Sequence, residues 1–217
     1  MTLRKHAIAL ALVGLVPLGG FLAACGGADL NAMGEDRDAM MQDGGHDMHD
    51  MDLGPADATY DLRFIDAMIM HHEGAIIMAE AALENSERPE IRQLAEDIIA
   101  AQEAEIAQMQ AWRGAWYPDA PAEPVMYHGE MGHEMPMTEE MAANMRMDVD
   151  LGAADDDFDL RFINAMIPHH EGAVVMAQDV IEKSDRAELQ DLGQEIIATQ
   201  QAEIDQMLAW RQTWYGQ

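Results

Sequence analysis

The chain has 217 residues, of which 41 are acidic and 12 are basic, so its formal net charge is −29. Phosphate binding depends on clustered lysine and arginine, and the sequence shows no such cluster, which argues against a nucleic acid partner. The single cysteine excludes an internal disulfide, and a metal site would therefore have to use His, Met, Asp or Glu.

Residues 1–24 are typical of an export signal. Arg4 and Lys5 precede an apolar run that glycine and proline interrupt, and this run is too short for a convincing membrane span. Small residues stand directly before Cys25, as in lipoprotein signals, in which the cysteine carries the lipid. We therefore expect a lipid on Cys25 and anchoring to the cell envelope, in the periplasm or on the outer face of the membrane. The alternative is an ordinary signal peptide and a chance buried cysteine.

Residues 25–58 are rich in Gly, Asp and Met and show little periodicity, which predicts a flexible linker. The linker contains a mixed tract of imidazole and thioether side chains. Thioethers are soft ligands that select Cu(I), and imidazole accepts either oxidation state of copper. A disordered, oxidation-tolerant tail is the alternative. The ligands that we expect to capture copper here are His46, Met48, His49 and Met51.

Two helices are predicted within residues 59–117, the first copy of a repeat. Apolar residues recur at steps of four and three over 65–83, and a second stripe covers 91–112. Residues 86–89 form the break between the helices, because a proline suits the first turn of a helix. Pro118 prevents the second helix from continuing.

Residues 118–157 form a second Met- and His-rich segment that is expected to be mostly loop. A short helix is predicted over 139–147, with Thr138 as its cap. Core packing explains methionines in a loop poorly, so we expect copper ligands in this segment too. These candidates are His128, Met131, His133 and Met135.

Residues 158–217 repeat the plan of the first copy at a constant offset, without an insertion. Asp61-Leu62-Arg63-Phe64-Ile65 returns as Asp159-Leu160-Arg161-Phe162-Ile163, and His71-His72-Glu73-Gly74-Ala75 returns as His169-His170-Glu171-Gly172-Ala173. A single helix pair cannot bury both of its apolar faces, whereas two pairs can. The sequence therefore predicts an all-α four-helix bundle made from two tandem helix-pair repeats. Two separate hairpins that each pair with another molecule are the alternative.

The duplicated His pairs are the main candidate for chemistry inside the bundle. In each copy a methionine stands one turn before the pair and another stands two turns after its first histidine, on the same side of the helix. Burying four imidazoles without partners costs desolvation, so a metal, a carboxylate or water has to compensate. Glu73 and Glu171, or Glu105 and Glu203, could supply the carboxylates. Hydrogen-bonded structural histidines and core-filling methionines are the alternative.

Other metal centres fit the sequence less well. Structural zinc favours cysteine ligands. A di-iron bundle needs Glu-x-x-His on two helices, and no repeat helix contains that motif. The one Glu-x-x-His, Glu130 to His133, lies in the second loop and contains a glycine.

Met-Ile-x-His-His-Glu-Gly-Ala, followed some thirty residues later by Gln-x-x-Glu-Ile-x-x-Met-x-x-Trp, resembles the family catalogued as domain of unknown function 305. Both copies match, over 61–117 and 159–215. This family includes CopM-like periplasmic copper-binding proteins, and the resemblance implies export, a ferritin-like bundle and copper binding through His and Met. A proline commonly precedes the His pair in this family, as Pro168 does in the second copy, whereas the first copy has Met70. The helix residues that the resemblance points to are Met68, His71, His72, Met78, Met109, Met166, His169, His170, Met176 and Met207.

The sequence thus predicts an extracytoplasmic copper-binding lipoprotein for copper sequestration, delivery or tolerance, with Cu(I) favoured. No arrangement of a nucleophile and a base is apparent, so we expect no catalytic turnover. The expected partners are copper ions, a membrane through the lipid, and either a second copy of the chain or a metal-delivery protein. A lipoprotein that serves structure or partner binding without metal, and a copper or di-iron redox enzyme, are the alternatives.

Overall fold

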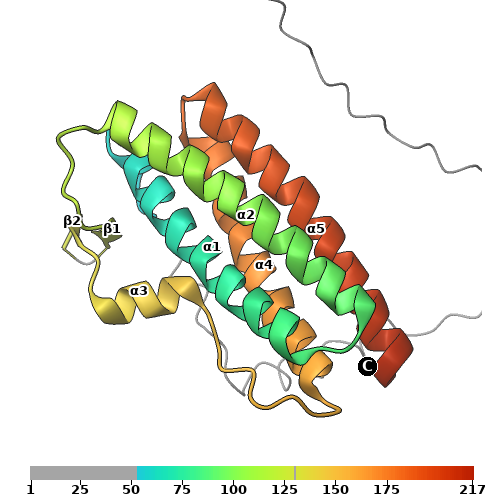
Figure 1. Cartoon of the computed structure of the whole chain (residues 1–217). Helices are drawn as coiled ribbons and strands as arrows, with labels where there is room; N and C mark the ends of the chain where they lie inside the picture. Colours follow the sequence, from blue (N-terminus) through green and yellow to red (C-terminus); the bar gives the residue numbers. More distant parts are fainter. Residues whose placement is uncertain (1–52, 130) are drawn as a thin grey trace, which may run out of the picture. The chain divides into compact units, whose positions relative to one another are not determined.

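The computed structural model describes residues 53–129 and 131–217, and four long helices form an all-α bundle in this part of the chain. Each copy supplies two consecutive helices, which confirms the predicted fold class (Figure 1). The four helices are α1 (Tyr60–Asn85), α2 (Pro89–Trp116), α4 (Phe158–Lys183) and α5 (Ala187–Tyr215). α2 begins at a proline, as the sequence predicts, and α4 is continuous although Pro168 lies inside it.

The two copies contact each other through hydrogen bonds and ion pairs at both ends of the bundle. α1 and α4 run antiparallel. Tyr60 at the start of α1 accordingly donates a hydrogen bond to Asp179 near the end of α4, at 2.7 Å. The loop of each copy is tied to the first helix of the other, through Arg88 Nε to Asp159 at 3.2 Å and through Arg186 Nε to Asp61 at 3.1 Å. Packing of the two copies is therefore reciprocal.

Stacked tryptophans occupy the last turns of α2 and α5. Trp112 and Trp116 lie with ring centroids 5.1 Å apart, and the guanidinium of Arg186 lies 4.1 Å from the Trp116 centroid. At the other end, Arg88 of the first copy lies 4.0 Å from the centroid of Trp214 in the second copy. Cations over indole faces attract the rings electrostatically. The loop arginines thus bind the other copy through an ion pair and an aromatic ring.

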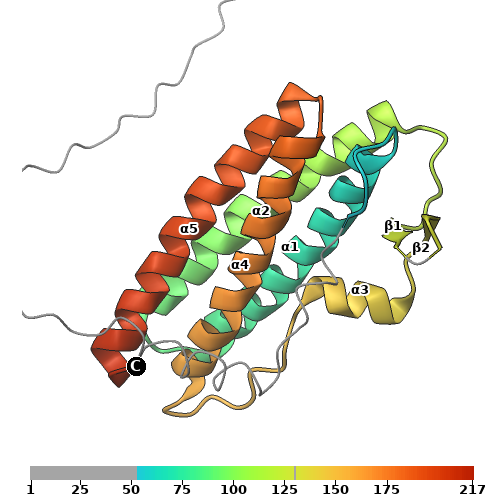
Figure 2. The same ribbon diagram turned by 180° about the vertical axis from the view of Figure 1, so that it is seen from behind.

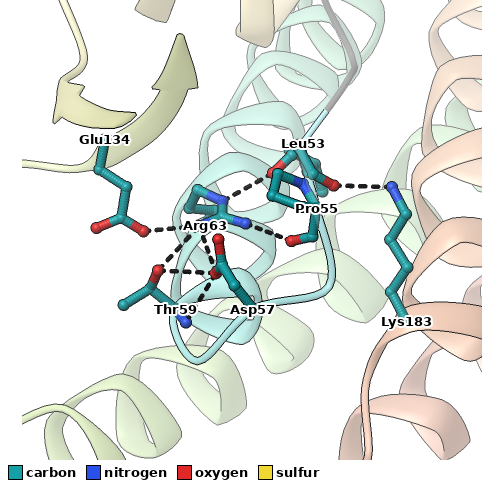
Figure 3. Close-up of polar contacts among 8 residues, drawn as sticks. Leu53, Pro55, Asp57, Thr59, Arg63, Glu134 and Lys183 are labelled. Carbon is teal, nitrogen blue, oxygen red and sulfur yellow. Dashed lines mark hydrogen bonds and ion pairs between the residues drawn. The ribbon is translucent and has the colours of Figure 1, made fainter. Parts of the chain in front are cut away.

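An arginine anchors the segment before the first helix of each copy. Arg63 is fully buried and donates to the backbone oxygens of Leu53 and Pro55, each at 2.7 Å, and to Asp57 at 2.9 Å (Figure 3). In the second copy Arg161 makes the same kinds of contact, but its side chain is 36% exposed. The structural repeat therefore begins before the helices, at Leu53 in the first copy and at Leu151 in the second.

The segment between the copies is more ordered than the sequence indicates. It contains a β-hairpin, β1 (Val125–His128) and β2 (His133–Pro136), which the sequence does not predict. The short helix appears as expected in α3 (Glu139–Arg146), and Thr138 Oγ1 accepts a hydrogen bond from the Met141 amide. The hairpin and α3 lie beside α1, outside the four-helix bundle (Figure 2).

Among residues 53–129 and 131–217, no helix is long and apolar enough to cross a membrane. The interior of the bundle is filled by aliphatic and aromatic side chains and by six methionines of the four long helices, which are completely buried. Four histidines and two glutamines interrupt this apolar interior, and they mark the candidate site.

Candidate metal site

The first histidine of each pair meets its counterpart across the interface between α1 and α4. His71 and His169 are 0% and 1% exposed, and their ring centroids lie 3.8 Å apart with a 50° tilt between the planes. The antiparallel packing of α1 on α4 produces this meeting, because each His pair lies near the middle of its helix. The copies therefore do converge on one point, as a shared site requires.

The second histidine of each pair is bound to a carboxylate of the other helix in its own copy. His72 Nε2 lies 2.6 Å from Glu105 Oε2, and His170 Nε2 lies 2.8 Å from Glu203 Oε2. All four positions follow the repeat, so α2 and α5 supply equivalent partners. Of the two carboxylate pairs that the sequence offers, Glu73 and Glu171 are instead exposed.

His169 has a further partner that comes from the connecting segment. Its Nε2 lies 2.9 Å from the backbone oxygen of Arg146, the last residue of α3. α3 can approach this closely because residue 74 of α1 is a glycine, and a Cβ there would overlap the Arg146 carbonyl. In contrast, both ring nitrogens of His71 are buried without a hydrogen-bond partner among the residues that the structure describes.

Burial keeps the two facing imidazoles neutral. Desolvation lowers the pKa of His71 well below its ordinary value, and the neighbouring His169, His72 and His170 lower it further. Desolvation, followed by the charge of His170, lowers the pKa of His169 to about 3. Neutral imidazole is the form that binds metal ions.

On each of the four buried histidine rings, Nδ1 lacks a hydrogen-bond partner among the described residues. In a neutral ring whose Nε2–H donates to an oxygen, Nδ1 carries a lone pair. A carboxylate or carbonyl that accepts from the other ring nitrogen is usual for a histidine that binds a metal. Buried polar atoms in proteins rarely lack a partner, so such atoms call for an explanation. The buried ring atoms without a partner are Nδ1 of His71, His72, His169 and His170, together with Nε2 of His71.

The six methionines that the sequence singles out in the bundle are all 0% exposed. They divide between two buried clusters, Met68, Met109 and Met176 in one and Met78, Met166 and Met207 in the other. Within the described ranges, no three His, Cys, Asp or Glu side chains lie close enough together to hold a metal ion. A three-ligand site in this conformation therefore needs methionine sulfur besides nitrogen and oxygen.

The predicted ligands of the connecting segment lie on the hairpin. His128 ends β1, His133 and Met135 belong to β2, and Met131 lies in the turn with its side chain 62% exposed. Met126 on β1 completes this group, although the sequence did not place it among the expected ligands. Period-two alternation along a strand was the available signal, but it required the hairpin to be recognised first.

Two buried glutamines near the site were not predicted from the sequence. Gln102 and Gln200 are each 3% exposed, and their side-chain oxygens lack partners. They line a cavity of about 10 Å³ between α2 and α5, next to Glu105 and Glu203. This volume holds about one water molecule. Their equivalent positions in the repeat were the signal that could have identified them.

The remaining sequence-based predictions lie outside the described residues. These are the lipidated Cys25 and the first mixed tract, His46, Met48, His49 and Met51.

Comparisons with known proteins identify the family of the chain. The sequence profile of a family described as domain of unknown function (DUF305) matches residues 61–211. A search of curated proteins gave no match.

Solved structures provide further relatives of the chain. CopM in its Cu(I)-bound form is 39% identical with a TM-score of 0.56, and the match covers 71% of this chain and 97% of CopM. CopM in a silver-bound form obtained by co-crystallization is 39% identical with a TM-score of 0.58 and the same coverage. A DUF305 fragment from Deinococcus radiodurans is 30% identical with a TM-score of 0.51, covering 72% of this chain and 97% of the fragment. The chain is thus a member of the DUF305 family.

Proposed function

We propose that this protein is an extracytoplasmic lipoprotein that binds copper for sequestration or delivery, without catalytic turnover. The observation that carries the proposal is the contact between His71 and His169, two buried neutral imidazoles with Nδ1 atoms that lack partners. Leaving these nitrogens unpaired costs free energy, which a bound ion would recover. Packing alone does not explain why the contact is made by histidines.

Relatives support copper as the metal. CopM, with about two fifths of its aligned residues identical to this chain, has been solved in Cu(I)-bound, Cu(II)-bound and silver-bound forms. Silver(I) and copper(I) are both soft ions, and soft ions prefer thioether and imidazole ligands. The helix methionines and histidines of this chain offer that ligand set.

The buried setting favours Cu(I) over Cu(II) in our proposal. Thioether sulfur selects Cu(I), whereas Cu(II) prefers square-planar nitrogen and oxygen ligands. The proposed ligands of the bundle are the His pairs and the buried helix methionines, Met68, Met78, Met109, Met166, Met176 and Met207. Glu105 and Glu203 would act behind His72 and His170, by fixing which ring nitrogen carries the proton.

The proposed location depends on Cys25, where the lipid would be attached. Mass spectrometry of the protein from a bacterial membrane fraction should show a diacylated cysteine, and a Cys25→Ala variant should leave that fraction. Recovery of an unmodified parent chain from the soluble fraction would refute the lipid anchor without affecting copper binding.

Copper binding is tested by loading the full-length chain with Cu(I) under anaerobic conditions against a competing chelator. We expect the parent to retain copper and the double variant His71→Phe/His169→Phe to lose at least one equivalent. Phenylalanine keeps a ring in the packed interface, so the helical circular dichroism should remain. Met141→Leu, which removes a methionine from α3 outside the bundle, is the matched control and should bind like the parent.

The same experiment separates the alternatives. A parent chain that binds no copper, combined with variants that lose their fold, would favour a structural or partner-binding lipoprotein. Oxygen consumption by the copper-loaded protein in the presence of a reductant would favour a redox enzyme.

A further inference from the structure

The hairpin between the two copies has one face fixed against the body of the protein. Val125 is 5% exposed and its amide donates to Asp66 of α1 at 2.9 Å. Glu134 accepts a hydrogen bond from the buried Arg63 at 2.7 Å (Figure 3). Tyr127 covers Gly54, where a Cβ would collide with the ring and where φ is +81°. These contacts determine which side of the ribbon points away from the bundle.

The register of the two strands places four potential ligands together on the opposite face. Met126 pairs with Met135 and His128 pairs with His133, while Tyr127 pairs with Glu134 between them. Residues directly opposite in an antiparallel ladder share a face, and alternate residues along a strand do so as well. The two Met and two His side chains therefore project from the outer face as neighbouring cross-strand pairs.

The spacing of these pairs suits a single small cation. Directly opposite Cβ atoms lie about 5 Å apart, and alternate residues of one strand lie about 7 Å apart. Met and His side chains extend far enough from such a rectangle to meet at one ion, since metal–sulfur and metal–nitrogen bonds are about 2.0–2.3 Å long. A set of two thioethers and two imidazoles is a soft ligand set suited to Cu(I).

The turn between the strands already orients one of the imidazoles. His133 Nδ1 lies 3.2 Å from the Met131 backbone oxygen, so Nδ1–H donates to it and the Nε2 lone pair is left for a metal. His128 Nδ1 accepts from the Met131 amide at 3.3 Å, a long contact that metal binding would have to replace. Met131 itself contributes backbone atoms to this arrangement and lies in the turn, outside the two paired strands.

The geometry points to a second copper site, a Cu(I) site on the outer face of the hairpin formed by Met126, His128, His133 and Met135. It rests on the proposed copper-binding function, but it is independent of the buried His pairs. Half-buried and exposed side chains make this site more accessible than the bundle interior. The hairpin would thus take up the ion first and exchange it rapidly.

The test uses the full-length chain loaded anaerobically with Cu(I) against a competing chelator. The double variant Met126→Leu/Met135→Leu should bind one copper equivalent less than the parent. Leucine has nearly the volume of methionine and the hairpin lies outside the bundle, so circular dichroism and thermal unfolding should not change. X-ray absorption should show less sulfur scattering in the double variant than in the parent, and the remaining sulfur signal should come from the bundle site.

Met131→Leu is the matched control, because it removes a methionine from the same tract but not from the two paired strands that carry the proposed ligands. It should bind as much copper as the parent. If Met131→Leu lost as much bound copper as the double variant, the proposal would be overturned. Copper binding would then depend on the number of methionines in the segment and not on the pairing of the two strands. Full copper binding by the double variant would also overturn it while leaving the bundle site intact. A parent chain without any copper would refute the proposed function itself.

Discussion

The two helix-pair copies have nearly the same fold but different surroundings. In the first copy Arg63 is fully buried and Asp66 pairs with Arg113 at 2.5 Å, whereas in the second copy Arg161 is partly exposed and Asn164 takes the place of Asp66. The difference comes from the connecting segment, which covers α1. Glu134 of the hairpin binds Arg63, and Asp66 accepts a hydrogen bond from the Val125 amide.

The connecting segment also makes the two facing histidines, His71 and His169, different. His169 donates to the Arg146 carbonyl at the end of α3, while neither nitrogen of His71 has a hydrogen-bond partner in the described part of the chain. An internal duplication thus gives two equivalent ligands, and a single-copy segment makes them unequal. His71 is consequently the imidazole with more freedom to move toward an ion.

The largest expected effect concerns the buried arginine. Arg63→Met should lower the free energy of unfolding by about 3 kcal/mol, because it leaves buried oxygens and Glu134 without their donor. Arg161→Met should cost less than about 1 kcal/mol, since that side chain is partly solvated. Urea unfolding followed by circular dichroism measures both. Equal losses would show that the hairpin does not make the two copies energetically different.

The close approach of α3 to α1 gives the next effect. Gly74→Ala should cost about 2 kcal/mol, because the new Cβ overlaps the Arg146 carbonyl and forces α3 away from His169. Gly114→Ala is the control on α2, where a Cβ meets nothing, and should stabilise the helix by up to about 1 kcal/mol. Thermal unfolding distinguishes them. A neutral Gly74→Ala would mean that α3 is not held in this position.

The smallest expected effect is the change in the free energy of unfolding of the metal-free protein for each pH unit. Burial lowers the pKa of His71 and His169 in the folded state, the latter to about 3, so the unfolded state takes up protons first as pH falls. Stability should therefore be independent of these groups above about pH 6.5 and fall below it, by about 1.4 kcal/mol per pH unit for each histidine.

Single variants test this titration in each copy. Urea unfolding at several pH values should show a shallower slope in both His71→Phe and His169→Phe. At pH 8, His169→Phe should cost more than His71→Phe, by about 1 kcal/mol, because only His169 donates to the Arg146 carbonyl. An unchanged slope in either variant would show that the histidine is not buried in solution as it is in the structure.

The sequence could predict features that depend on neighbours along the chain. Helical periodicity located α1, α2, α4 and α5, proline located the start of α2, and Thr138 located the start of α3. The repeated motif identified the family and the four buried histidines. The hairpin was not predicted, because its strands are only four residues long and its stability depends on Arg63 and Asp66 of α1.

By itself, then, the sequence determined the duplicated helix pairs, the family and the supply of His and Met ligands, since these depend on spacing within one segment. Only the tertiary structure decided that Glu105 and Glu203, and not Glu73 and Glu171, bind the histidines, and that His71 meets His169. It also decided which face of the hairpin carries ligands. The physical reason is that burial, hydrogen-bond partners and strand register are set by segments distant in the chain, and local patterns carry no information about those segments.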